Sequence, residues 1–242
     1  MSETTDRPQL GKLFAPRRSN YYFGQLLDEL KLFKEQDYFT NMQRLLNRLA
    51  LGSGVLCGLE ITPAADGSHV VLSPGMAVDP FGRLIIVPAE TSLDPRQVTD
   101  SAGMVISTIP SADSGTVEVR LHYHETQADY ALYTAGDCDS SEQSAPDTIV
   151  ENYCLEVVNT QVFNSPSENE ALCSALTGNA ADLAERRQNL YAAVPREWPA
   201  PPTNDGVALG MVELTGDGQT GMIDTSSDRT ILYSNAQLLG AC

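Results

Sequence analysis

The chain has 242 residues, of which 42% are hydrophobic and 19% are charged, enough apolar sequence to form a core and to exclude a disordered chain. Its 32 acidic residues outnumber 15 basic ones, and the formal net charge of −17 excludes binding to nucleic acid or to anionic membrane surfaces. No long apolar run and no apolar signal segment occur, so we expect cytoplasmic synthesis and no membrane insertion.

The charge is unevenly distributed along the chain. Residues 1–50 are close to neutral, whereas the remainder is strongly acidic. The acidic excess either serves solubility or forms a face for a basic partner. A near-neutral arm on an acidic body indicates that the two parts have different neighbours.

The N-terminal part is predicted to be an arm followed by a helix. Residues 1–19 are polar and contain Pro8 and Pro16, and an aromatic cluster follows at Tyr21, Tyr22 and Phe23. The spacing predicts a helix over residues 28–50, with Asp28 as its N-cap and Gly52 as its stop. Its apolar positions are more than one packed face needs, which predicts an assembly surface on residues 1–50. The predicted surface residues are Tyr21, Tyr22, Phe23, Leu30, Phe33, Phe39, Met42 and Leu46.

The middle of the chain reads as short strands separated by turns. We expect strands at 55–62, 69–72, 76–78, 84–87, 104–106 and 116–125, with turns at Asp66-Gly67 and Pro80-Phe81-Gly82. Cys57 lies in an apolar strand and is expected in the core. The residues predicted to shape the turns are Gly24, Gly52, Gly54, Gly58, Gly75, Asp79, Gly82 and Arg83.

The C-terminal half continues this pattern with one more helix. Residues 134–148 are predicted to be a polar loop, 149–163 and 206–215 strands, and 168–193 a helix. The predicted fold is therefore α+β: a helical arm over 1–51, then a β-rich, sandwich-like domain over 52–242 with a possible sub-boundary near 134–148.

The sequence contains no complete catalytic constellation. Alternating positions place His122 and His124 on one face of a strand, where they are either two solvated side chains or half of a metal site. There is no phosphate-binding loop and no nucleophile elbow. We therefore expect neither enzymatic activity nor a cofactor.

The glycine-rich block over residues 20–88 carries a family resemblance. Its motifs are Gly24 to Leu27, Glu35-Gln36-Asp37-Tyr38, Asn47-Arg48, Gly52 to Leu59 and Pro74 to Arg83, with weaker matches at 149–157 and 229–233. Together they resemble a family of structural proteins associated with contractile injection systems, which are phage-tail-like particles. The chain departs from that pattern at Ala50-Leu51, where a histidine is expected before the glycine.

The resemblance implies a structural component of such a particle, in its baseplate, fibre-attachment or cap region. It implies baseplate, fibre, sheath or cap proteins as partners, or copies of the chain itself. Two alternatives remain open at this point. One is a carbohydrate-binding module that uses Trp198 or tyrosines as a stacking platform, and the other is a metalloprotein built on His122 and His124.

Overall fold

The computed structural model describes residues 15–133, 143–159, 188, 202–226 and 229–233. The chain divides into two compact units, one formed by residues 1–42 and 164–203 and the other by residues 43–163 and 204–242. The division falls inside the long helix, after Met42. The predicted boundary at residue 51 and the sub-boundary near 134–148 stay predictions.

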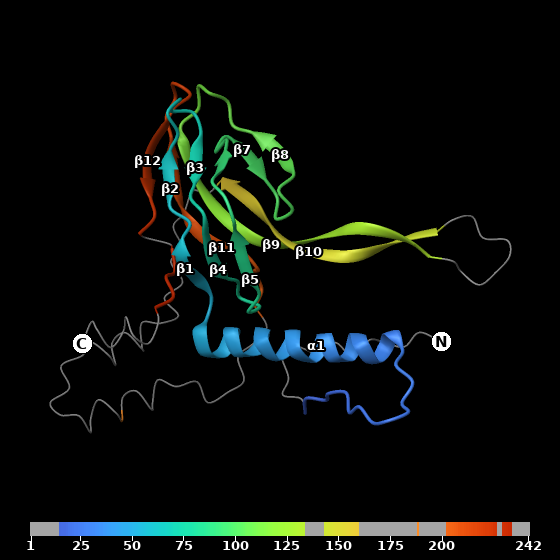
Figure 1. Ribbon diagram of the computed structural model, residues 1–242. Helices are drawn as coiled ribbons and strands as arrows, with labels where there is room; N and C mark the ends of the chain where they lie inside the picture. The colour runs from blue at the N-terminus through green and yellow to red at the C-terminus, as the bar shows by residue number, and fades with distance from the viewer. Residues whose placement is uncertain (1–14, 134–142, 160–187, 189–201, 227–228, 234–242) are drawn as a thin grey trace. The chain divides into compact units, whose positions relative to one another are not determined.

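The first unit contains most of α1 (Glu29–Leu46), which continues as a short π-helical segment, Asn47–Leu51 (Figure 1). The predicted N-cap is confirmed, because Asp28 Oδ1 accepts a hydrogen bond from the Lys31 N–H at 3.0 Å. The predicted stop also occurs, since the N–H of Gly52 donates to the Asn47 carbonyl at 3.0 Å and Gly52 has φ +84°. The helix predicted at 168–193 lies outside the described residues except for residue 188, which is helical.

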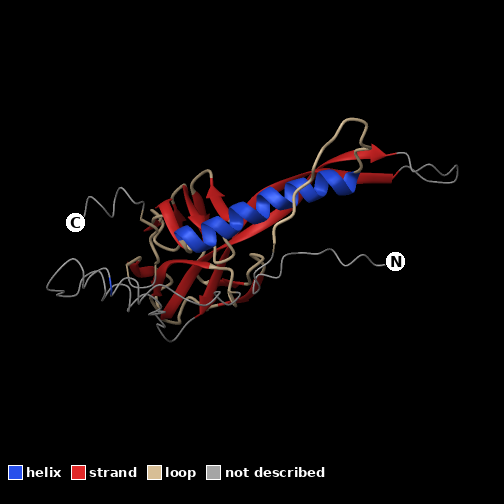
Figure 2. Ribbon diagram, turned by 90° about the horizontal axis from the view of Figure 1, so that it is seen from below, coloured by secondary structure: helices blue, strands red, loops and turns tan. Residues whose placement is uncertain are grey.

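The second unit is built from strands (Figures 1 and 2). They are β1 (Gly54–Gly58), β2 (Ile61–Pro63), β3 (Val70–Leu72), β4 (Gly75–Val78), β5 (Leu84–Val87), β6 (Thr91–Leu93), β7 (Gln97–Thr99), β8 (Val105–Thr108), β9 (Gly115–Tyr133), β10 (Gln143–Asn159), β11 (Val207–Leu214) and β12 (Thr220–Asp224).

The described strands form four antiparallel sheets, in the orders β1-β4-β5, β10-β9-β11-β12, β2-β3-β6 and β7-β8. A single cluster of buried aliphatic side chains joins three of them, including Val55 of β1, Leu72 of β3, Leu121 of β9 and Leu209 of β11. The α+β prediction is therefore confirmed.

Several strand predictions need correction. Residues 143–148 are not a loop but the first part of β10, and β9 continues to Tyr133 rather than ending at residue 125. Strands β6, β7 and β12 were not predicted, because each is only three to five residues long and lacks a clear alternation. Cys57 is exposed, so its predicted place in the core is wrong.

The C-terminal segment pairs with β1, the edge strand of the β1-β4-β5 sheet. Val55 forms a parallel bridge with Ile231, and backbone hydrogen bonds of 2.8 Å join Val55 to Thr230 and to Leu232. The Arg229 guanidinium donates to the carbonyl oxygen of Leu59 at 3.0 Å. Two segments of the family resemblance, Gly52 to Leu59 and Arg229 to Tyr233, therefore lie side by side.

Candidate assembly surface

The arm before α1 folds back along the start of the helix within the first unit. The Ser19 hydroxyl donates to the Lys31 carbonyl at 3.1 Å, and the Tyr21 hydroxyl donates to the Glu35 carboxylate. That carboxylate raises the pKa of Tyr21, chiefly through the hydrogen bond. These two hydrogen bonds hold the arm against the helix.

The arm ends in a tight turn that presents apolar side chains. The N–H of Gln25 donates to the Tyr22 carbonyl at 3.2 Å, and Gly24 has φ +80°. Tyr22 is 67% exposed and Phe23 is fully exposed. The turn therefore displays two aromatic rings.

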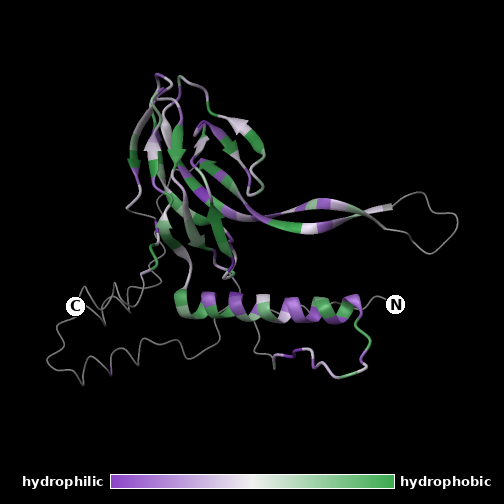
Figure 3. Ribbon diagram, in the orientation of Figure 1, coloured by the Kyte–Doolittle hydropathy of each residue, from purple (hydrophilic) through white to green (hydrophobic). Residues whose placement is uncertain are grey.

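Helix α1 contributes further apolar residues, whose hydropathy colours parts of its ribbon green in Figure 3. None of its residues is buried among the described parts of the chain. Leu30, Phe33, Phe39 and Leu46 are between 53% and 65% exposed, whereas Met42 is half-buried. The structure thus displays nearly the whole predicted apolar set, while its role in assembly stays a prediction.

Within the second unit, the end of the helix, which includes Arg44 and Asn47, packs on the β4–β5 turn. Asn47 donates to the Gly82 carbonyl at 3.0 Å, and a Cβ added to Gly82 would overlap the carbonyl oxygen of Arg44. Gly82 also has φ +82°. Both the positive φ and the nearby Arg44 carbonyl therefore disfavour a side chain at this position.

Asp79 holds the same turn from inside. Its buried carboxylate accepts the backbone N–H groups of Phe81 at 2.9 Å and Arg83 at 2.8 Å, and pairs with the Arg83 side chain. Burial raises the pKa of Asp79, although Arg83 and the backbone N–H groups oppose the shift.

Two arginines then cover one aromatic ring. The guanidinium carbons of Arg83 and Arg44 lie 4.7 Å and 5.7 Å from the centroid of the Tyr123 ring. The turn, the helix end and β9 therefore form one connected site. The assignment of the turn residues as structural stays a prediction.

Three other predicted turn glycines, Gly54, Gly58 and Gly75, lie where a second stretch of backbone passes closely, whereas Gly24 and Gly52 do not. A Cβ on Gly58 would overlap the Pro74 carbonyl, and one on Gly75 would overlap the Cys57 carbonyl. A Cβ on Gly54 would lie 2.5 Å from the Thr230 carbonyl oxygen. These three motif glycines thus lie where two stretches of backbone approach each other.

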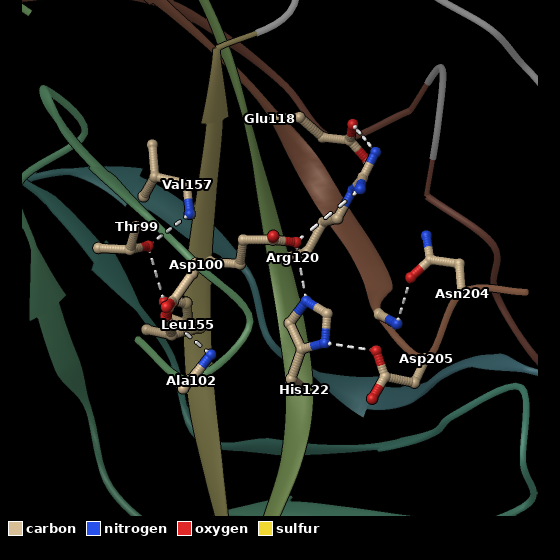
Figure 4. Close-up of polar contacts among 12 residues, drawn as sticks. Thr99, Asp100, Ala102, Glu118, Arg120, His122, Leu155, Val157, Asn204 and Asp205 are labelled. Carbon is tan, nitrogen blue, oxygen red and sulfur yellow. Dashed lines mark hydrogen bonds and ion pairs between the residues drawn. The ribbon is translucent and has the colours of Figure 1, made fainter. Parts of the chain in front are cut away.

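His122 is not solvated, contrary to one of the two expectations for it. Only 2% of the residue is exposed, and its ring lies between two carboxylates: Nδ1 is 3.0 Å from Asp205 and Nε2 is 2.8 Å from Glu156 (Figure 4). Arg120 extends the network, since its guanidinium donates to both oxygens of Glu118 at 2.9 Å and 2.7 Å. Hydrogen bonding to Glu118 is the main cause that raises the pKa of Arg120.

This network bears on the metal alternative. Both His122 nitrogens are engaged by carboxylates within the protein, and His124 is half-buried on the same strand. Among the described residues no three His, Cys, Asp or Glu side chains are arranged to hold a metal ion. His122 instead fixes Asp205, and with it the point where the chain enters β11.

Asp205 and Glu156 are the polar residues that sequence reasoning missed. Glu156 lies opposite Arg120 in the β9–β10 register, and Asp205 precedes β11 by two residues. Alternation along β9 places Glu118, Arg120 and His122 on one face, but it does not reveal which segment covers that face.

No protein-family model matches the chain, and no curated protein matches it. Among solved structures, the baseplate complex of the type VI secretion system is similar, with 11% identity and a TM-score of 0.39 over 87% of this chain and 58% of that chain. A TssK-TssF-TssG baseplate subcomplex of the same system gives 9% identity and a TM-score of 0.39 over 87% and 60%. The chain thus spans less than two thirds of the length of these structures. No helix in the described parts is both long and apolar enough to cross a membrane.

Proposed function

We propose that the chain is a non-catalytic structural component of a contractile, phage-tail-like injection particle, in its baseplate, fibre-attachment or cap region. It is made in the cytoplasm and becomes part of the assembled particle. It contacts other particle proteins through the apolar surface of the arm and α1. The family resemblance over residues 20–88 supplies the context.

The observation that carries the assembly role is the exposure of that surface. None of the 18 residues of α1 is buried among the described parts of the chain, although helices in proteins depend mainly on tertiary packing. Large side chains such as Phe33 and Phe39 stay more than half exposed. We take this exposed apolar surface as an interaction site.

The test is a pair of substitutions on this surface, Phe33→Ser with Phe39→Ser. The control is Ile106→Ser with Met222→Ser, which removes two apolar side chains that are 66% and 71% exposed on strands of the second unit. We expect the first pair to reduce the amount of the chain that co-purifies with intact particles at least about tenfold, and the control pair to leave it unchanged. Equal incorporation of both double variants would contradict the proposal.

The carbohydrate-binding alternative relied on Trp198, which lies outside the described residues, or on tyrosines as a stacking platform. No other described feature favours it over the assembly role.

A further inference from the structure

Strands β9 and β10 form a ribbon that extends well past the rest of the second unit. They pair from Val117–Asn159 to Tyr133–Gln143, with one interruption at Asp129 and Asp147, whereas β11 pairs with β9 only as far as Leu121. Figures 1 and 2 both show the far part of the ribbon running out from the other strands. We name residues 125–133 and 143–151 the distal ribbon. A two-stranded ribbon alone is marginally stable in water, so packing against another surface would stabilise this one.

The distal ribbon is acidic throughout. It contains four carboxylates, at Glu125, Asp129, Asp147 and Glu151, and no Lys, Arg or His. Glu125 lies directly opposite Glu151, and Asp129 and Asp147 lie between the neighbouring pairs 128–148 and 130–146 but are not themselves a register pair. Like charges directly opposite in a sheet are destabilising. The ribbon therefore carries one pair of like charges directly opposite each other and two further carboxylates.

The carboxylate pair at the root of the ribbon is only partly compensated. The Tyr123 hydroxyl lies 2.8 Å from Glu125 and 3.0 Å from Glu151, yet it has one proton to donate. Arg44 lies 3.7 Å from Glu125. Within the described residues, Glu151 has the Tyr123 hydroxyl alone as a hydrogen-bonding partner. The pair retains negative charge that an external cation would neutralise.

Apolar side chains lie exposed between these charges. Tyr130 and Ile149 are each 63% exposed, and Val150 is 43% exposed. Addition of a further strand at the edges is opposed by Pro146, which has no N–H, and by Asp129, whose φ is +52°. The faces of the ribbon, rather than its edges, are thus suited to contact.

We infer that the distal ribbon docks on a basic protein surface that presents Lys and Arg side chains around an apolar patch. Charge complementarity selects this occupant, because the distal ribbon carries four carboxylates and no basic side chain. The inference adds a second contact to the one proposed for the arm and α1. It does not depend on whether the partner is a particle protein.

The test is site-specific photocrosslinking in cells that make the full chain, with p-benzoylphenylalanine in place of Tyr130. The crosslinked peptides are identified by mass spectrometry. We expect adducts with a Lys- and Arg-rich segment of a different protein. Adducts confined to this chain, adducts with a second copy, or no adduct at all would each overturn the inference.

A matched pair of variants tests the role of charge in the same crosslinking experiment. Asp129→Asn with Asp147→Asn removes two charges from the ribbon, and asparagine tolerates the positive φ at residue 129. Glu90→Gln with Asp113→Asn removes two charges from exposed positions elsewhere in the second unit. We expect the ribbon pair to lower the adduct yield about fivefold and the control pair to leave it unchanged. Equal yields would overturn the inference.

The identity of the crosslinked protein separates this inference from the proposed function. A basic partner that is a particle component supports both proposals. A basic partner from outside the particle supports the ribbon contact and counts against the particle role. A chain that enters particles but gives no adduct at residue 130 leaves the particle role standing and removes the ribbon contact.

Discussion

At the scale of single residues, the turn from Asp79 to Arg83 shows how local sequence and tertiary contact combine. The Pro-Phe-Gly sequence predicts a turn, and Gly82 does adopt a positive φ. The sequence does not show that the Arg44 carbonyl occupies the place of a Cβ at residue 82. That contact joins residues 38 positions apart, which no local pattern encodes.

Substitution of Gly82 measures that contact. Gly82→Ala is expected to lower the free energy of unfolding by about 2–3 kcal/mol, through the left-handed backbone and the overlap with Arg44. Gly218→Ala is the control, because its φ is +87° but its Cβ would lie 3.5 Å from Ser111, an ordinary contact. It should cost only about 1 kcal/mol in denaturant unfolding. Equal losses would show that the helix end does not pack on the turn.

The two histidines of β9 are expected to behave differently. His122→Ala leaves Glu156 and Asp205 without the group between them, and should destabilise the protein by about 2–3 kcal/mol. His124→Ala should change the free energy of unfolding by less than about 0.5 kcal/mol. Elemental analysis should find the same metal content in both variants and the parent. Stoichiometric zinc that disappears in both variants would favour the metalloprotein alternative.

Tyr123 gives the protein a specific response to alkaline pH. Burial, and then the nearby Glu125 and Glu151 carboxylates, raise its pKa above the ordinary value of 10.0. Above pH 10 the unfolded chain loses this proton first, so the folded state binds more protons and its stability falls as pH rises. Below pH 10 both states keep the proton and the contribution is constant.

The corresponding measurement is the free energy of unfolding between pH 8 and pH 11. The parent should lose up to about 1.4 kcal/mol per pH unit more than Tyr123→Phe above pH 10. Parallel curves for the two proteins would show that the Tyr123 hydroxyl does not lie in the described environment.

At the scale of elements, the sequence predicts the helix and the turns, which have local patterns. It does not predict strand ends that depend on pairing with a distant strand. The helix start at Asp28 and the turns at residues 66–67 and 80–82 follow from local chemistry. The start of β10 at Gln143 does not, because Gln143 to Pro146 is polar and pairs only with the far end of β9. Cys57 was placed in the core from its apolar neighbours, yet β1 is exposed at that residue.

Removal of the arm tests the contribution of this element to assembly. Deletion of residues 1–27 retains the Asp28 cap, the whole of α1 and the aliphatic core, so the melting temperature should change by less than about 3 °C. Incorporation into particles should be lost, because Tyr22 and Phe23 are removed. Wild-type incorporation of the truncated chain would place the assembly contact elsewhere.

At the scale of the whole molecule, the structure shows where part of the acidic excess lies. The sequence gives a net charge of −17 but leaves open whether the excess serves solubility or a partner. The structure gathers four of the carboxylates on a ribbon with exposed apolar side chains, and displays a near-neutral apolar helix in the other unit. Two surfaces of different chemistry indicate contacts with different neighbours.

The central claim is that the chain is a stoichiometric structural part of a contractile injection particle. Quantitative mass spectrometry of gradient-purified particles, calibrated with labelled peptides of this chain and of the sheath protein, tests it directly. The account predicts a fixed ratio that corresponds to a whole number of copies per particle, because oligomeric assemblies are symmetric. Absence from particles, or a ratio that varies between preparations, would contradict it.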